Sequence, residues 1–294
     1  MSDYIEKLQA FEQKKDFFVG IDSDGCAFDT MEIKHKECFI PNTINYWGLQ
    51  PISRFAREAA EFVNLYSLWR GINRFPALTM VLDLLAERRE VAERGFSVPA
   101  AAGLREWIER ESRLGNPALA EAVAETKNPD LKQALDWSTS VNEAVSKIVR
   151  NIPPFPHVCE SLEKLSGVAD VIVVSATPDE ALQREWAEHD IAGYTGMICG
   201  QEMGTKSEHI QYAAGGKYAP DNILMVGDAP GDLKAASTNN ALFFPIIPGK
   251  EAESWRRFRE EAMEKFLAGQ YRGMYEDSLI AEFTARLPST PPWQ

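Results

Sequence analysis

Four aspartates follow two apolar segments that lie far apart in the chain. The first segment leads directly into Asp22 and Asp24, and the second leads into Asp228 and Asp232. A short apolar run of this kind is typical of a strand buried within a parallel sheet. Carboxylates gathered at the ends of such strands repel one another unless a cation binds between them. The four residues therefore predict a magnesium site and phosphoryl chemistry.

Two more polar residues, at the end of another predicted strand and at a predicted helix start, belong to the same pattern. Ser175 ends a further apolar run, and Lys206 lies in Thr205-Lys206-Ser207-Glu208. That tetrapeptide has the Thr-x-x-Glu spacing of a capping box, which predicts a helix start at Lys206. The residues 177–180 show the same spacing and predict a helix start just after Ser175. The backbone amides of that helix start would face a bound phosphate.

In this order, the motifs resemble those of the haloacid dehalogenase superfamily, in its phosphatase branch. The family carries Asp-x-Asp after a first strand, Ser or Thr after a second, an isolated Lys, and Gly-Asp with another Asp four residues on. The matching residues here are Asp22, Asp24, Ser175, Lys206, Asp228 and Asp232. The resemblance covers about the first thirty residues and the stretch from about 150 to 250. Lys217 is a rival for the isolated Lys, although its Gly-Gly-Lys setting indicates a surface turn.

The resemblance implies a role for each of these residues. Asp22 would be the nucleophile that forms an aspartyl-phosphate, and Asp24 would act as general acid and then as base. The cofactor would be Mg²⁺, and its ligands would be Asp22, the backbone carbonyl of Asp24, Asp228 and Asp232. The phosphate-binding residues would be Ser175, Lys206, Ser23 and Ala176.

The second aspartate of the first motif narrows the function that the resemblance implies. Dehalogenase-like members lack it, because a departing halide needs no proton. Asp24 therefore favours a phosphatase, a phosphoric monoester hydrolase that acts on a small phosphorylated metabolite. Two alternatives stay open: a phosphomutase with the same motifs, and a non-catalytic protein of this fold that binds a metal or a metabolite.

Composition and charge disfavour some classes of binding partner and some cellular locations. The 294 residues carry a formal net charge of −13, which disfavours nucleic acid and anionic membranes as partners. No apolar stretch approaches the ~20 residues of a membrane span, and no secretory signal is visible. The four cysteines are scattered, which is typical of free thiols in a reducing compartment. We therefore predict a cytoplasmic protein, and its oligomeric state stays open.

The segment from residue 51 to residue 150 has helical periodicity throughout. Five helices are predicted, at 53–69, 76–94, 99–113, 117–127 and 129–149. An all-helical block inside an α/β chain indicates an inserted domain, and the resemblance implies that it is a cap. Arg70 and Arg74 lie in the segment that joins the first two of these helices. Both arginines are candidates for binding substrate. The alternative is that both arginines only solvate a helix end.

Beyond residue 150, helical and strand patterns alternate, which predicts a parallel sheet with right-handed crossovers. The expected fold class is α/β, with a Rossmann-like core and an inserted all-α cap. The expected domains are the core at 1–34, the cap at 35–150, the core again at 151–250, and a C-terminal helical extension at 251–294. The last residues, 289–294, are expected to be loosely held.

Overall fold

The computed structural model describes residues 3–294 and divides the chain into two compact units. The sheet unit holds the chain up to Met31 together with Asn151–Leu287. The helical unit holds Glu32–Arg150 together with Pro288–Gln294. The chain therefore passes between the two units three times, and residues 251–287 belong to the sheet unit.

The sheet unit is built on five parallel strands in the order β3-β2-β1-β4-β5. Their bounds are β1 Phe17–Ile21, β2 Ala169–Val174, β3 Met197–Cys199, β4 Ile223–Gly227 and β5 Leu242–Pro245. Ile21 at the end of β1 lies opposite Val173 of β2 and Val226 of β4. The α/β fold with a parallel sheet, predicted from sequence, is confirmed, and β1 lies at its centre.

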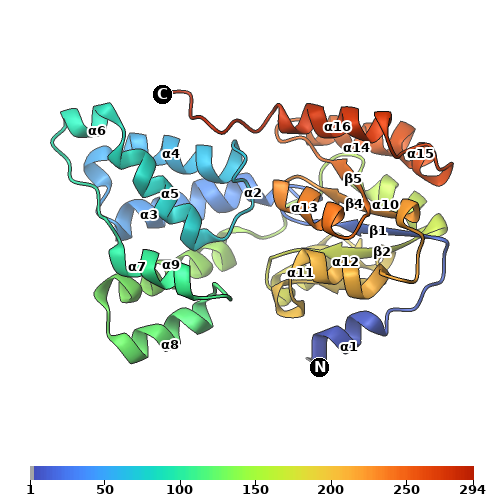
Figure 1. The fold of residues 1–294 in the computed structure, drawn as a ribbon, viewed down its shortest axis with the longest axis horizontal. Helices are drawn as coiled ribbons and strands as arrows, with labels where there is room; N and C mark the ends of the chain where they lie inside the picture. The colour runs from blue at the N-terminus through green and yellow to red at the C-terminus, as the bar shows by residue number, and fades with distance from the viewer. Residues whose placement is uncertain (1–2) are drawn as a thin grey trace. The chain divides into compact units, whose positions relative to one another are not determined.

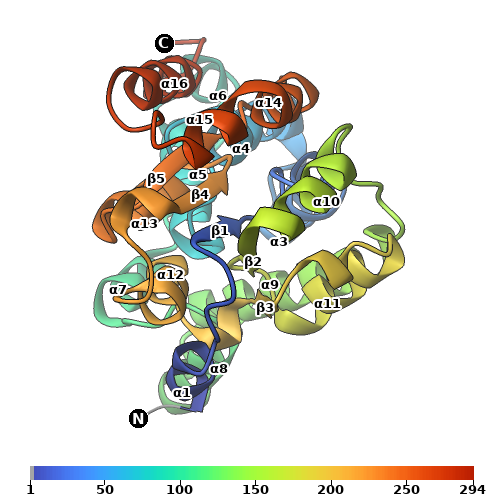
Figure 2. The same cartoon turned by 90° about the vertical axis from the view of Figure 1, so that its right-hand side faces the viewer.

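Helices cover both faces of this sheet, which explains why the strands are apolar at nearly every position. Successive residues of β1 point to opposite faces: Phe18 joins one apolar cluster, whereas Val19 and Ile21 join the other. Figure 2 shows α12 and α13 on one side of the strands, with α10 and α11 on the other. The helices of this unit are α1 Asp3–Gln9, α10 Val158–Val168, α11 Asp179–Glu188, α12 Lys206–Ala214, α13 Pro230–Thr238, α14 Glu251–Arg257, α15 Met263–Leu267 and α16 Met274–Thr284. The short helix α2, Thr30–Ile33, spans the first passage between the units.

The helical unit has no strand within residues 32–150 (Figure 1). Its helices are α3 Ile40–Tyr46, α4 Ser53–Leu65, α5 Arg74–Ala86, α6 Arg89–Glu93, α7 Ala102–Arg110, α8 Asn116–Thr126 and α9 Pro129–Ile148. The single helix expected at 76–94 is two helices, because Arg88 adopts an extended backbone between α5 and α6. The Arg88 guanidinium is buried and pairs with Glu58 at 2.5 Å, so this break is fixed by a tertiary contact. Among residues 3–294, no helix combines the length and apolar character that crossing a membrane would require.

The C-terminal segment is not loosely held, contrary to the expectation from sequence. The extension is helical only as far as Thr284, and residues 288–294 pack on the helical unit. The Trp293 ring lies edge-to-face against Phe62, with centroids 5.8 Å apart. The guanidinium of Arg88 lies 4.4 Å from the centre of the Trp293 ring. An aromatic anchor thus fixes a short proline-rich segment that sequence reasoning alone treats as a free end.

Candidate active site

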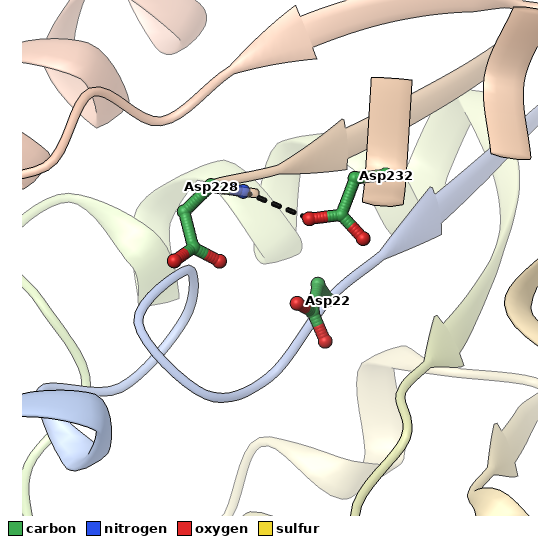
Figure 3. A group of neighbouring side chains, drawn as sticks. All are labelled: Asp22, Asp228 and Asp232. Atoms are coloured by element: carbon green, nitrogen blue, oxygen red, sulfur yellow. Dashed lines mark hydrogen bonds between the residues drawn. The ribbon is translucent and has the colours of Figure 1, made fainter. Parts of the chain in front are cut away.

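Three buried carboxylates meet at the carboxyl edge of the sheet (Figure 3). One carboxylate oxygen from each of Asp22, Asp228 and Asp232 lies within 4.8 Å of the others. Asp22 directly follows β1 and Asp228 directly follows β4, and these strands are paired neighbours. Asp232 lies in the first turn of α13, where its Oδ2 accepts hydrogen bonds from the backbone N–H groups of Asp228 and Ala229, at 3.1 and 3.0 Å. The parallel pairing of β1 with β4 thus brings together carboxylates that are far apart in sequence.

Gly227 is required at the end of β4. A Cβ at this position would lie 2.4 Å from the side chain of Asp232, closer than real side chains approach one another. Any other residue here would displace Asp232, and with it the contacts that fix the loop before α13. The Gly-Asp sequence of the fourth motif therefore has a packing reason in this fold.

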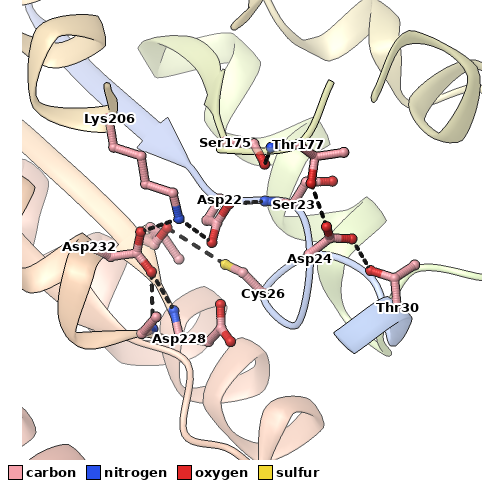
Figure 4. A network of polar contacts seen from close by, with 12 residues as sticks. Asp22, Ser23, Asp24, Cys26, Thr30, Ser175, Thr177, Lys206, Asp228 and Asp232 are labelled. Atoms are coloured by element: carbon pink, nitrogen blue, oxygen red, sulfur yellow. Dashed lines mark hydrogen bonds and ion pairs between the residues drawn. The ribbon is translucent and has the colours of Figure 1, made fainter. Parts of the chain in front are cut away.

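Lys206 supplies positive charge to this cluster (Figure 4). Its Nζ lies 2.6 Å from Asp22 Oδ2 and 2.6 Å from Asp232 Oδ1. The capping box predicted at the start of α12 is confirmed: the Thr205 side chain accepts from the Glu208 N–H, and the Glu208 side chain accepts from the Thr205 N–H. This reciprocal pair fixes the first turn of α12 and hence the position of Lys206. Lys217 instead donates to the backbone carbonyls of Gln9 and Phe11.

The electrostatics of the cluster favour a further cation. Burial raises the pKa of the Asp22 carboxyl well above its usual value, Lys206 acts against this rise, and Asp232 and Asp228 add to it. Burial alone would lower the pKa of Lys206, but the carboxylates of Asp22 and Asp232 outweigh it and raise that pKa. Three buried carboxyl groups thus lie close together beside the ammonium group of Lys206. Oxygen ligands in such a group fit Mg²⁺, so Asp22, Asp228 and Asp232 are the residues that would hold it.

The Asp24 carboxylate does not join this cluster, and the prediction of a four-carboxylate group is wrong in this respect. The chain turns sharply after Asp22: Gly25 has a positive φ of 76°, and Asp24 forms a bridge with Phe28. The Asp24 carboxylate accepts hydrogen bonds from the hydroxyl groups of Thr177, at 2.5 Å, and of Thr30 (Figure 4). It is therefore held within the loop that follows β1, apart from the other acids.

The capping box predicted at 177–180 does not form. Helix α11 begins at Asp179, and its N-cap is Pro178, with no side-chain cap. Thr177 stands one residue before the cap, and its hydroxyl donates to Asp24. The same Thr-x-x-Glu spacing therefore has a local function at Thr205 and a tertiary one at Thr177.

The other candidate phosphate-binding residues lie near the same strand ends. They differ in burial and in the hydrogen bonds that their side chains make. Ser175 is buried, and its Oγ accepts from the Thr177 N–H at 3.2 Å. Ala176 is exposed in the bend that follows β2. The Ser23 hydroxyl accepts from the Trp186 indole at 3.0 Å, and the Ser23 N–H donates to Asp22 Oδ1 at 2.8 Å. The Ser23 side chain thus anchors the loop, and only its backbone lies towards Asp22.

Sequence reasoning did not identify three residues that position the candidate site. Thr30 and Thr177 hold Asp24, and Trp186 holds Ser23. In the sequence, the only indication for Thr177 is its position two residues after Ser175. The Thr-x-x-Glu spacing at that position predicts a helix cap and not a bond to Asp24. Neither Thr30 nor Trp186 belongs to any motif that sequence analysis could have used.

The two candidate substrate arginines belong to the helical unit. Arg70 is buried, and its Nη1 donates to the Leu65 carbonyl at 2.9 Å. The Nη1 group of Arg74 donates to the side chains of Ser138, at 2.9 Å, and Asn142, at 2.7 Å. Arg70 is therefore not a solvated charge at a helix end, whereas Arg74 begins α5 and is half-buried.

Comparison with known proteins agrees with the arrangement of the sheet unit. A family model described as haloacid dehalogenase-like hydrolase matches residues 39–238, more than half of the chain. The matched region includes Lys206 and Asp228 and begins after Asp22. No curated protein matches the chain at a significant level.

A search of solved structures found similar chains with low sequence identity. A haloacid dehalogenase-like hydrolase from Streptococcus pneumoniae is 14% identical, covers 92% of this chain and 100% of its own, and has a TM-score of 0.45. A hydrolase of the same superfamily, subfamily IA, from Geobacter sulfurreducens is 15% identical over 80% of this chain and 89% of its own, with a TM-score of 0.40. A protein described as a predicted phosphoglycolate phosphatase from Haemophilus somnus is 16% identical over 82% of this chain and 93% of its own, with a TM-score of 0.42. The match to the family model over residues 39–238 places the chain in the haloacid dehalogenase-like hydrolase family.

Proposed function

We propose that this protein is a magnesium-dependent phosphatase, which hydrolyses a small phosphorylated metabolite through an aspartyl-phosphate on Asp22. The observation that carries the proposal is the buried Asp22 carboxylate, 2.6 Å from Lys206 and beside the carboxylates of Asp228 and Asp232. Phosphoryl transfer depends mainly on positioning and on stabilisation of charge. A buried nucleophile between a fixed ammonium group and a cation site supplies both.

The first step of the proposed reaction transfers the phosphoryl group to the enzyme. A carboxylate oxygen of Asp22 attacks phosphorus, and the bond between phosphorus and the ester oxygen breaks. The Asp24 carboxyl group gives its proton to the departing alkoxide, which leaves as an alcohol. Ser175 and Lys206 donate hydrogen bonds to the phosphoryl oxygens, where negative charge accumulates.

The second step returns the enzyme to its starting state. The Asp24 carboxylate takes a proton from a water molecule, and the water oxygen attacks the phosphorus of the aspartyl-phosphate. The bond between phosphorus and the Asp22 oxygen breaks, which releases inorganic phosphate and restores the Asp22 carboxylate. The same carboxyl group, that of Asp24, thus gives the proton in the first step and regains one in the second.

The cation would be held by Asp22, Asp228 and Asp232, with the backbone carbonyl of Asp24 as a further ligand. When bound, Mg²⁺ would offset the repulsion between the Asp22 carboxylate and the negatively charged phosphate. The close grouping of three buried carboxyl groups supports this assignment. The cysteines are all free thiols, which supports the expectation of a reducing, cytoplasmic location.

The test is phosphate release from a panel of phosphorylated metabolites, with and without Mg²⁺. We expect metal-dependent release from the wild type and a loss of about a thousandfold or more in Asp22→Asn. Asp136→Asn is the matched control, because Asp136 is an exposed acid of the helical unit, and it should keep the wild-type rate. An Asp22→Asn variant with wild-type activity would exclude the proposed nucleophile. Isomerisation of a phosphorylated sugar without net release would identify a phosphomutase instead.

A separate readout tests the metal site without turnover. We expect Mg²⁺ at a hundred times its Kd to stabilise the wild type by about 2.7 kcal/mol. The corresponding rise in Tm should disappear in Asp228→Asn and persist in Asp136→Asn. An equal rise in all three proteins would place the cation elsewhere.

A further inference from the structure

The loop that follows β1, residues 22–28, carries both aspartates of the first motif, and we call it the Asp22 loop. Its backbone folds around the Ser23 carbonyl, which accepts from the N–H groups of Cys26, Ala27 and Phe28, at 3.3, 2.9 and 3.0 Å. These internal bonds give the loop a compact shape. Its orientation on the sheet depends on bonds to other elements.

One group of these bonds joins the loop to the end of β4. The Val226 carbonyl accepts from the Asp22 N–H at 2.9 Å and from the Cys26 thiol at 3.6 Å (Figure 4). A thiol is a weak donor, so the backbone bond is the stronger of the two. The start of the loop is therefore better fixed by β4 than the turn at Cys26.

The Cys26 carbonyl is bonded to a different part of the chain, the C-terminal extension. It accepts from the indole Nε1–H of Trp255 at 2.7 Å, and both residues are fully buried. A buried carbonyl needs a partner within the protein because water does not reach it. Trp255 lies in α14, beyond residue 238, where the match to the family model ends.

The Trp255 indole itself is supported by packing and by the start of its helix. Its ring lies edge-to-face against Phe258, with centroids 5.5 Å apart, and the Phe258 ring lies 5.0 Å from that of Phe244 in β5. The Ser254 hydroxyl accepts from the Ile247 N–H at 3.1 Å, which joins α14 to the segment after β5. The indole therefore reaches the loop from a well-packed support.

A second buried indole bonds to the same loop from another helix. Trp186 of α11 donates to the Ser23 hydroxyl at 3.0 Å, and its ring packs edge-to-face on Phe28, with centroids 5.7 Å apart. Trp186 thus holds the side chains of the loop, whereas Trp255 bonds to its backbone. A bond to the backbone bears directly on where the two aspartates lie.

We propose that Trp255 is a positioning residue for the reaction, because its indole N–H holds the Asp22 loop through the Cys26 carbonyl. The inference rests on the proposed function, in which the Asp22 oxygen and the Asp24 proton must both be placed accurately. Misplacement of reacting groups by about 1 Å can lower a rate by about a hundredfold. The C-terminal extension thereby contributes to the site through one hydrogen bond.

Two variants separate this hydrogen bond from the packing of the indole. Trp255→Phe keeps a large aromatic ring but has no N–H. Trp255→His can place its Nε2–H at the position that Nε1–H has in the five-membered ring of the indole, but it lacks the second ring. We expect Trp255→His to be the less stable of the two, because it leaves the larger cavity.

The first arm of the test is steady-state phosphate release with Mg²⁺, at a temperature where every protein is folded. We expect kcat to fall about tenfold in Trp255→Phe with KM nearly unchanged, and to lie closer to the wild-type value in Trp255→His. The control is Trp137→Phe, which removes an equally buried indole donor that bonds to the Thr43 hydroxyl at 3.1 Å in the helical unit. It should keep the wild-type kcat.

Two kinetic results would overturn the proposal. One is an equal kcat in Trp255→Phe and Trp137→Phe. The other is a kcat that is lowest in Trp255→His, because the rate would then follow stability rather than the presence of the donor.

The second arm, amide hydrogen exchange in the protein without ligand, needs no turnover. We expect the N–H groups of Cys26, Ala27 and Phe28 to exchange about two- to tenfold faster in Trp255→Phe than in the wild type. The increase should be smaller in Trp255→His and absent in Trp137→Phe. Wild-type exchange in Trp255→Phe overturns the proposal whatever the kinetics show. Faster exchange without turnover in the wild type contradicts the proposed function, but leaves the hold of Trp255 on the loop intact.

Discussion

At the scale of single residues, the candidate site separates two aspartates that are almost adjacent in sequence. Asp22 lies in the buried cluster with Lys206, whereas the Asp24 carboxylate is held by two threonine hydroxyls. This separation gives the two carboxylates different surroundings, as the proposed nucleophile and the proposed acid–base group require. The residues that create it, Thr30 and Thr177, would therefore affect the proposed chemistry without acting in it.

Thr177→Val should impair the proposed acid–base step. The substitution keeps the side-chain volume but removes a hydroxyl that bonds to a carboxylate, an interaction of about 1.5–3 kcal/mol. We expect kcat for phosphate release to fall about tenfold with little change in KM, and Thr177→Ser to restore it. The control is Thr195→Val, because the Thr195 hydroxyl donates to the nearby Ala192 carbonyl. If Thr177→Val and Thr195→Val had the same kcat, Thr177 would not position Asp24.

His209 should make the protein sensitive to mild acid. Burial lowers its pKa from 6.5 to about 4, and the charge of Lys206 adds to this effect. Between pH 6.5 and 4 the unfolded chain therefore binds more protons at this position than the folded protein does. The free energy of unfolding must fall as the pH falls through this window, by up to about 3 kcal/mol from this one group.

The measurement is urea denaturation at several pH values for the wild type and His209→Gln. Carboxylates that titrate in the same range are common to both proteins, so the difference between the two pH dependences isolates His209. We expect a shallower dependence in the variant. A wild-type slope in His209→Gln would show that other groups account for the acid sensitivity.

At the scale of elements, two strands and two helix starts determine where the charged groups of the site lie. β1 and β4 end at the same edge and place Asp22 beside Asp228, and the starts of α12 and α13 place Lys206 and Asp232. Each position is set by backbone geometry rather than by a flexible loop. Active sites at the carboxyl ends of parallel strands follow the same rule in other α/β proteins.

Loss of the capping box should loosen the helix that presents Lys206. In Thr205→Ala the N-cap acceptor disappears, at a cost of about 1 kcal/mol in the free energy of unfolding. We expect this loss in chemical denaturation, together with a modest fall in phosphate release because Lys206 is less well fixed. Thr126→Ala is the control, since the exposed Thr126 lies at the carboxyl end of α8. Equal stability of the two variants would show that the capping box contributes nothing.

At the scale of the whole molecule, the chain passes between the units three times rather than the two that an insertion requires. The third passage follows Leu287, which is buried in the sheet unit, and the segment ends on the helical unit at Trp293. Only five residues lie between these two anchors, a span of about 20 Å when fully extended. Three prolines in this segment restrict its backbone and lower the entropy that docking must overcome.

Trp293→Ala should destabilise the helical unit. The substitution uncovers the buried Arg88 guanidinium and the Phe62 ring, with an expected loss of about 1–3 kcal/mol. Hydrogen exchange should become faster in α4 and at residues 85–91. Gln294→Ala, which changes the exposed last residue, should leave exchange unchanged. Wild-type protection of α4 in Trp293→Ala would contradict a stabilising role for the segment.

The sequence by itself determined the class of fold and most of the candidate site. Apolar runs that end in acids predicted the strands, and because the carboxyl ends of parallel strands meet at one edge, Asp22 and Asp228 were expected at the same edge. The pairing of β1 with β4, which only the structure gives, makes them neighbours. The Thr205 capping box placed Lys206 at a helix start, because a capping box acts within four consecutive residues. These predictions succeed because each depends on local spacing or on a general rule of sheet geometry.

Only the tertiary structure decided where the remaining side chains point. Thr177 and Thr205 carry the same local pattern, yet the Thr177 hydroxyl bonds to Asp24, far away in sequence. Trp293 lies near the end of the chain, yet it packs on Phe62. Contacts of this kind depend on which surfaces the fold brings together, and local spacing holds no information about a partner on another element. For that reason the sequence identified the acids of the site, whereas the groups that hold Asp24 and the bond from Trp255 to Cys26 emerged only in three dimensions.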